Sequence, residues 1–289
     1  WFDARDIALT LKADEMVIFG QAMKGADAEM SLRSGRLAIS RFNVADISGA
    51  ALALTGDLDG VTAGTRHDVK GRFNGSIKAD RFGGILAIGG FDVPDVEGPV
   101  DIVVNGFSGE ADDSDLRVDT MTLQGTLRGS RVDGVLKRRH GPAGGVDRLE
   151  IAGNAANGEG RILLEQLGLS PRSDLSGAGT ISVQLNGDTG GTYDTNFRVN
   201  VGGTTLTARG KVEAPFEAIR FTGRADIAAS GVMHVLGGFG APDGLAHWVG
   251  RQAAGPGFVF SSDVVWDKQR LALSDLEAIA GSFRLLGEA

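Results

Sequence analysis

Strict alternation of apolar and polar residues is the feature that most constrains the fold of this chain. In residues 6–14, Ile7, Leu9 and Leu11 alternate with polar or charged residues except at Ala8. This pattern is typical of a β-strand with one apolar and one polar face. It returns along most of the sequence, for example at Leu52 and Leu54. We therefore predict a mainly β protein built from short amphipathic strands.

Amphipathic strands must cover their apolar faces, and the composition limits how they do so. The chain has 289 residues with 45 glycines and only 6% aromatic residues, which indicates many turns and thin strands. Two sheets packed as a filled β-sandwich would cover the apolar faces, and so would one sheet curled around an apolar ligand. The alternation alone favours the β-sandwich. Both arrangements stay open at this point.

A segment of the sequence occurs twice without a gap. Residues 73–94 and 221–242 share seven identities, five of which are Gly or Pro. These residues set backbone geometry, so the repeat indicates a repeated shape. The segments 49–56 and 203–210, which precede the copies, also resemble each other. We predict two β-rich units, residues 1–148 and 149–289, within one continuous sheet and without a linker.

About four short helices are predicted where the alternation stops. Apolar residues at helical spacing mark 82–88, 161–168, 226–236 and 245–253, and glycines follow most of these segments. Each predicted helix is too short to be stable alone in water. We therefore expect all of them to pack on the sheet.

The composition excludes several classes of site. The formal net charge of −8 argues against a nucleic-acid partner, and the absence of Cys removes disulfides and thiolate chemistry. The four histidines have no metal-ligand spacing, and His234 is interpreted as packed or solvated. We expect no enzyme activity, no catalytic or metal-binding residue and no cofactor. No apolar run approaches the roughly 20 residues that span a bilayer.

Two charged stretches are interpreted as solvated surface. The acidic residues of 110–115 lack the spacing of a calcium loop. The basic run 137–140 is a small patch beside a Gly-Pro turn, and a solvated hairpin end explains it more simply than lipid headgroup binding does.

Several short sequence motifs occur here in the same order as similar motifs of the AsmA-like protein family, which the chain therefore resembles. The helix-like segment 161–168 leads to Leu-Ser-Gly-Ala-Gly at 175–179 and then to an alternating strand that ends at Gly187. The segments 6–15, 34–45 and 49–56 are similar to other phrases of that family. Each phrase is degenerate, and the resemblance rests on their order over most of the chain.

The resemblance implies a long, twisted antiparallel sheet curled into a groove, in an envelope protein of a Gram-negative bacterium. Such proteins are anchored in the inner membrane by one helix, extend through the periplasm and are implicated in conducting phospholipid to the outer membrane. The chain begins at Trp1 without such a helix. We expect it to be an internal, periplasmic piece of a longer protein, with the anchor upstream.

The predicted function is non-enzymatic binding or conduction of phospholipid in outer-membrane biogenesis, with acyl chains as partner. A structural scaffold that pairs strands with an outer-membrane β-protein is the alternative. The candidate lipid-facing residues alternate along four predicted strands: Ile7, Leu9, Leu11, Leu52, Leu54, Ile181, Val183, Leu185, Phe197, Val199 and Val201.

Overall fold

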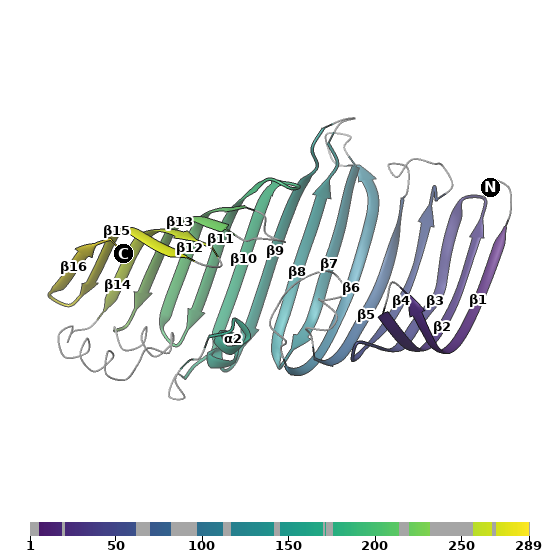
Figure 1. The fold of residues 1–289 in the computed structure, drawn as a ribbon, viewed down its shortest axis with the longest axis horizontal. Coiled ribbons are helices and arrows are strands. Elements are labelled where there is room, and N and C mark those ends of the chain that lie inside the picture. Colours follow the sequence, from purple (N-terminus) through teal and green to yellow (C-terminus); the bar gives the residue numbers. More distant parts are fainter. Residues whose placement is uncertain are drawn as a thin grey trace. The chain divides into compact units, whose positions relative to one another are not determined.

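The mainly β prediction is confirmed by the computed structural model. The structure describes residues 6–18, 21–61, 70–81, 97–111, 117–141, 145–169, 171, 176–213, 220–231, 257–267 and 270–288. Their strands form one open antiparallel sheet in which each strand neighbours the one before it in the chain, from β1 to β16 (Figure 1). This topology differs from the two packed sheets of a β-sandwich.

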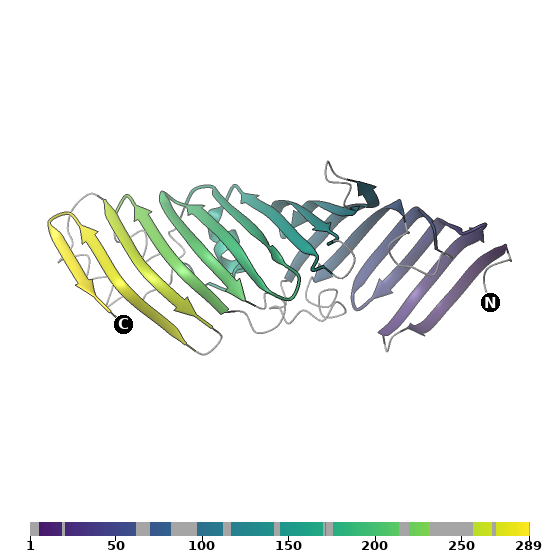
Figure 2. The ribbon, with the colours of Figure 1, turned by 90° about the horizontal axis from the view of Figure 1, so that it is seen from above.

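The chain divides into two compact units, Trp1–Leu149 and Glu150–Ala289, with the boundary inside β9 (Arg148–Asn157). The strands of unit 1 follow one another in both views (Figures 1 and 2). They are β1 (Ile7–Ile18), β2 (Gln21–Arg33), β3 (Arg36–Ile47), β4 (Ala50–Asp59), β5 (Lys70–Arg81), β6 (Glu97–Ala111), β7 (Arg117–Leu127) and β8 (Ser130–Arg139).

The described residues of unit 2 contain the rest of β9, one helix and seven further strands. These elements are α2 (Gly160–Gln166), β10 (Gly179–Asp188), β11 (Thr192–Val201), β12 (Thr204–Glu213), β13 (Arg220–Ala229), β14 (Phe258–Trp266), β15 (Leu271–Ala280) and β16 (Phe283–Gly287).

Short turns set the strand register. Ser34 and Gly35 both have positive φ, of 48° and 81°, and they join β2 to β3 where Arg33 pairs with Arg36. Two-residue turns of this kind match the twist of paired strands, so β2 and β3 form a hairpin here. Positive φ also occurs at Arg128 and Gly129 between β7 and β8. These two turns therefore fix the register of β2 with β3 and of β7 with β8.

The prediction of about four helices is wrong for the described part of the chain, which contains α2 alone. The helix predicted at 161–168 is α2, whereas those predicted at 82–88 and 245–253 lie outside the described residues. The helix predicted at 226–236 is wrong in its first part, because Asp226 lies in β13. The remainder from residue 232 lies outside the described residues.

The error in β13 has a physical cause. Every second side chain of β13 is less exposed than its neighbours, and the less exposed positions include Gly223 and Ala225. Small residues carry little hydrophobic signal, so the alternation is hard to recognise in the sequence. Pairing with β12 and β14 on both sides then decides the strand conformation.

The two sequence repeats differ in register by two residues. Gly56 pairs with Phe73 in unit 1, whereas the corresponding Gly210 pairs with Gly223 in unit 2. Phe73 corresponds to Phe221, which is two residues before Gly223. A shift of two residues keeps the same side chains on the same face, because successive side chains alternate. The division of the chain into repeat units at residue 148 stays a prediction.

The helix α2 packs on β10 and β11 (Figure 1). Leu163 is completely buried, and Leu164 forms a core cluster with Val199 and Val201. A Cβ added at Gly179 would lie only 2.7 Å from the Cα of Gly160. The helix therefore approaches the sheet closely because two glycines face each other.

We predict that Gly179→Ala destabilises unit 2 by about 1–3 kcal/mol, because the added methyl group forces the helix and sheet backbones apart. Gly158→Ala is the matched control, since a Cβ at Gly158 would have no atom within 4 Å. Urea denaturation of both variants measures the difference. Equal stability of Gly179→Ala and Gly158→Ala would contradict the close contact.

Candidate functional site

The cross-strand register gathers the apolar side chains of unit 1 on one face of the sheet, which we call the unit 1 apolar face. One row of directly paired residues crosses the eight strands β1 to β8. The same-face rows on either side of it, two residues away along each strand, are also mainly apolar. This row consists of Leu11, Ala28, Phe42, Leu54, Gly75, Val104, Leu123 and Gly134.

Unit 2 has a corresponding apolar face. A row of paired residues crosses β10 to β16, and it consists of Ile181, Val199, Leu206, Ile227, Phe260, Ala278 and Leu285. The other face of these strands is polar. It carries the ion pair between Arg224 and Asp263, 3.2 Å apart, and a hydrogen bond of 2.6 Å from Ser261 to Asp226.

All eleven predicted lipid-facing residues lie on the apolar face of their own unit. Ile7, Leu9 and Leu11 lie on β1, and Leu52 and Leu54 on β4. In unit 2 the register pairs residues of β10 directly with residues of β11, namely Ile181 with Val199, Val183 with Phe197, and Gly179 with Val201, while Leu185 pairs with Thr195.

The exposure of these residues differs. Leu9 retains 47% of its surface and Ile7 38%. Val199 and Val201 retain only 7% and 4% and form the core beneath α2. The helix α2 therefore covers the part of β10 and β11 where lipid contact was predicted. The apolar side chains of β1 remain accessible.

Large apolar side chains near the end of unit 2 are also accessible on its apolar face. The register places Trp266 beside Leu271, and Leu285 beside Ala278. The exposed fractions of Trp266, Leu271 and Leu285 are 42%, 59% and 49%. Several neighbouring apolar side chains therefore remain in contact with water, which is unfavourable by about 25 cal/mol per Å².

Unit 1 also contains a network of charges that sequence reasoning did not find. This ionic cluster consists of Ser108, Arg117, Asp119, Arg138, His140 and Asp147. Asp119 pairs in register with Arg138, two residues beyond the apolar pair of Met121 and Leu136. Successive same-face positions are two residues apart, so the ionic cluster borders the unit 1 apolar face.

Asp119 lies at the centre of the ionic cluster. His140 Nε2 lies 2.7 Å from Asp119 Oδ2, Ser108 donates a hydrogen bond of 2.7 Å to Oδ1, and Arg117 Nε donates one of 3.2 Å to Oδ1. Burial acts to raise the pKa of Asp119, but the hydrogen bonds from His140 and Ser108 and the charge of Arg117 outweigh it. The pKa is therefore lowered.

Asp147 closes the loop between β8 and β9 in a similar way. Its carboxylate accepts a hydrogen bond of 2.8 Å from Arg138 Nε and one of 3.1 Å from the backbone N–H of Gly141. Burial opposes ionisation, but these bonds and the charges of Arg138 and His140 lower the pKa of Asp147. His140 Nδ1 lies 3.5 Å from Asp147 Oδ2, so the imidazole lies between two carboxylates.

The ionic cluster contains a serine, a histidine and aspartates, but their order does not make a nucleophile. The Ser108 hydroxyl donates to Asp119 and accepts from Arg117 Nη2 at 2.7 Å. An activated serine would instead donate to the histidine that removes its proton. The geometry therefore supports an electrostatic role at the border of the apolar face.

One signal in the sequence locates this cluster. The Arg128–Gly129 turn pairs Leu127 with Ser130, and counting back along both strands brings Asp119 opposite Arg138. The basic run 137–140 was interpreted as one solvated patch, although Arg138 and Lys137 are adjacent in sequence and therefore point to opposite faces.

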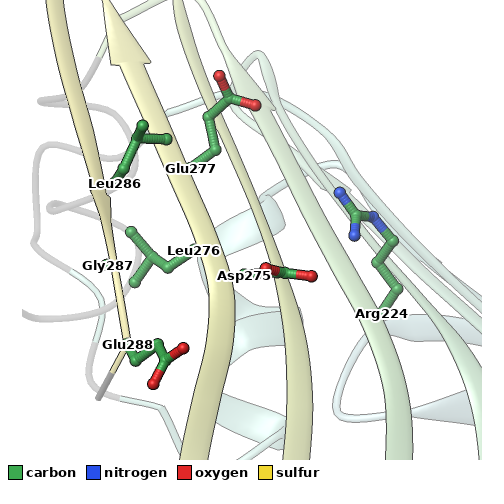
Figure 3. Close-up of a pocket in the computed structure, with 7 residues that line it drawn as sticks. All are labelled: Arg224, Asp275, Leu276, Glu277, Leu286, Gly287 and Glu288. Carbon is green, nitrogen blue, oxygen red and sulfur yellow. The ribbon is translucent and has the colours of Figure 1, made fainter.

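Two hollows of the described surface are lined mainly by polar residues. A hollow of about 490 Å³ on β13–β16 is lined by Arg224, Asp275, Glu277 and Glu288 among others (Figure 3). Arg224 is already paired with Asp226 and Asp263. A second hollow of about 510 Å³ in unit 1 is lined by Arg36, Lys70 and Phe107 among others. Both belong mainly to the polar face.

Other expected features lie partly outside the described residues. His234, together with most of the acidic stretch 110–115, falls there. Within the described ranges, no three potential metal-ligating side chains form a group. In the same ranges, no helix has the length and apolar character needed to cross a membrane.

Comparison with known proteins identifies no relative. No protein-family model, no curated protein and no solved structure matches the chain. The candidate site therefore rests on geometry alone: an apolar face in each unit, helix α2 over part of one face, and the ionic cluster at the border of the other.

Acid should weaken unit 1 through the ionic cluster. A carboxyl whose pKa is lower in the folded state than in the unfolded state stabilises the fold above the unfolded value, near 4, and loses this contribution as the pH falls through the folded value. We predict that Asp119→Asn lowers the stability of unit 1 at pH 7 and reduces the further loss between pH 5 and pH 3. Urea denaturation across this pH range, with the exposed Asp194→Asn of β11 as control, measures both effects. An unchanged pH profile in Asp119→Asn would contradict the prediction.

Proposed function

We propose that this chain is a non-enzymatic lipid-binding segment, whose two apolar faces bind the acyl chains of phospholipid. The supporting observation is the set of paired apolar rows, in which large side chains such as Leu9 and Leu271 keep 47% and 59% of their surface exposed. A lipid chain covering such a row removes this surface from water and gains about 0.8 kcal/mol per buried CH₂.

The setting that fits this proposal is the one implied by the resemblance to AsmA-like proteins. The sheet would curl around its apolar face as a groove, in the periplasm, anchored to the inner membrane by a helix outside this chain. Sequential antiparallel strands support such a conduit, because each added strand of a unit extends its apolar rows; α2 covers these rows on β10 and β11 only. Phospholipid would move along the rows between the inner and outer membranes.

A structural scaffold is the second candidate function. All five residues of the edge strand β16 are exposed, and an edge strand offers unpaired backbone groups to a partner strand. A scaffold for an outer-membrane β-protein would crosslink to protein at Leu285, whereas a lipid conduit would crosslink to lipid there.

We predict that a phospholipid with brominated acyl chains quenches the fluorescence of Trp266. The test uses Trp1→Phe/Trp248→Phe, which retains Trp266 alone of the three tryptophans. As control, Trp266→Phe/Val259→Trp in that background places the indole on the polar face of β14, where Val259 is 52% exposed. Quenching of Trp266 and not of the indole at position 259 supports the proposal. Equal quenching, or none, would contradict it.

A charge on the apolar face should abolish binding. We predict that Leu9→Glu reduces the binding of fluorescent phospholipid several-fold, because an ionised carboxylate resists contact with acyl chains. Val103→Glu is the matched control on the polar face of β6, since Leu9 and Val103 are 47% and 44% exposed. Extraction of lipid from both purified variants provides a second measurement. Identical lipid content in the two variants would contradict binding on the apolar face.

A further inference from the structure

The ionic cluster lies where the apolar rows of β6–β8 end. We infer that it receives the polar headgroup of a zwitterionic phospholipid whose acyl chains lie on the unit 1 apolar face. This inference rests on the proposed function and adds an orientation and a headgroup class to it. The orientation follows from the contrast between the two ends of these strands, and the headgroup class follows from the charges of the ionic cluster.

At one end of β7 and β8 the same-face pairs change directly from apolar to ionic. Met121 pairs with Leu136, and the next same-face pair is Asp119 with Arg138. Toward the other end, the pairing of Val100 with Leu127 continues the apolar face to the turn. On the unit 1 apolar face, the paired residues of β7 and β8 are therefore ionic at the Asp119–Arg138 end and apolar toward Leu127.

This contrast determines how an amphiphile lies. An acyl chain gains from contact with the partly exposed residues Val104, Met121 and Leu123, which lie on the unit 1 apolar face. It gains nothing beside ionised groups, and a charged headgroup placed over the apolar rows would lose its hydration without compensation. The most favourable orientation places the headgroup at the ionic cluster and the chains toward Val104.

The charges of the cluster suit a headgroup that carries both signs. The guanidinium groups of Arg117 and Arg138 match the geometry of phosphate oxygens. The carboxylates of Asp119 and Asp147 match an ammonium group. The cluster is accessible to such a ligand, because the Arg138 side chain is 48% exposed and that of Asp119 28%.

The test uses vesicles that contain a photoreactive phosphatidylethanolamine. In one probe the diazirine is attached to the headgroup, and in the other it is at the end of an acyl chain. After irradiation, mass spectrometry maps the labelled residues of the full chain. We expect headgroup labelling around 117–119 and 138–141, and acyl-chain labelling around 104 and 121–125.

Each outcome has one meaning. Acyl-chain labelling on the unit 1 apolar face without headgroup labelling at the cluster would overturn this inference and leave the proposed function intact. Headgroup labelling on the unit 1 apolar face together with acyl-chain labelling at the ionic cluster would also overturn this inference and leave the proposed function intact. Failure of both probes to label the apolar face of either unit would overturn the proposed function itself, and the inference with it.

A variant tests the role of charge directly. We expect Arg138→Gln to reduce headgroup labelling several-fold while acyl-chain labelling persists. Arg131→Gln, an exposed position on the opposite face of β8, should leave both unchanged. Circular dichroism and thermal unfolding confirm that each variant is folded. Undiminished headgroup labelling in folded Arg138→Gln would contradict the assignment.

Discussion

Antiparallel pairing between strands that are neighbours in the sequence is the constraint on which the rest of this structure depends. A slip of one residue between two strands would move every side chain of one strand to the opposite face. The apolar row through Leu54, Gly75 and Val104 exists because three successive strands keep compatible register. The tight turns at Ser34–Gly35 and Arg128–Gly129 help to fix this register. The composition of each face is therefore a consequence of the strand register.

An amphipathic sheet can cover its apolar face with its own chain or with a ligand, and this chain shows the first arrangement beneath α2 and also where Val44, Val100 and Ile102 of unit 1 are buried. The helix α2 covers β10 and β11, where close contact between Gly160 and Gly179 allows Leu163 to be fully buried. Elsewhere, Leu9 and Leu271 remain substantially exposed. A ligand that supplies apolar contact would play the part that α2 plays over Val199 and Val201. This comparison within one molecule is the strongest physical argument for a lipid partner.

The ionic cluster gives the unit 1 apolar face a defined end. Asp119 carries a lowered pKa because His140, Ser108 and Arg117 stabilise its charge against the cost of burial. The network joins β6, β7, β8 and the loop that follows them through side chains. It therefore fixes the ends of three strands and also creates a sharp change from apolar to charged surface, which is the property that orients an amphiphile.

The success of sequence reasoning depended on the size of the side chains involved. Alternation of large residues, as in Ile181 and Val183, was sufficient to predict strands and the face on which these residues lie. Alternation of glycine and alanine around Gly223 and Ala225 was not, and a helix was predicted to begin at Asp226 where β13 continues. The helix α2 was predicted because its leucines recur at helical spacing and Gly168 follows it.

The sequence by itself determined that the chain is mainly β, that its strands are one-sided and which residues share a face, because side-chain direction alternates along any strand. Only the tertiary structure decided that the strands join one sheet in chain order, that α2 covers Val199 and Val201, and that Asp119 meets His140. These features depend on contacts between residues distant in sequence. Such contacts are fixed by register and packing, which local patterns do not encode.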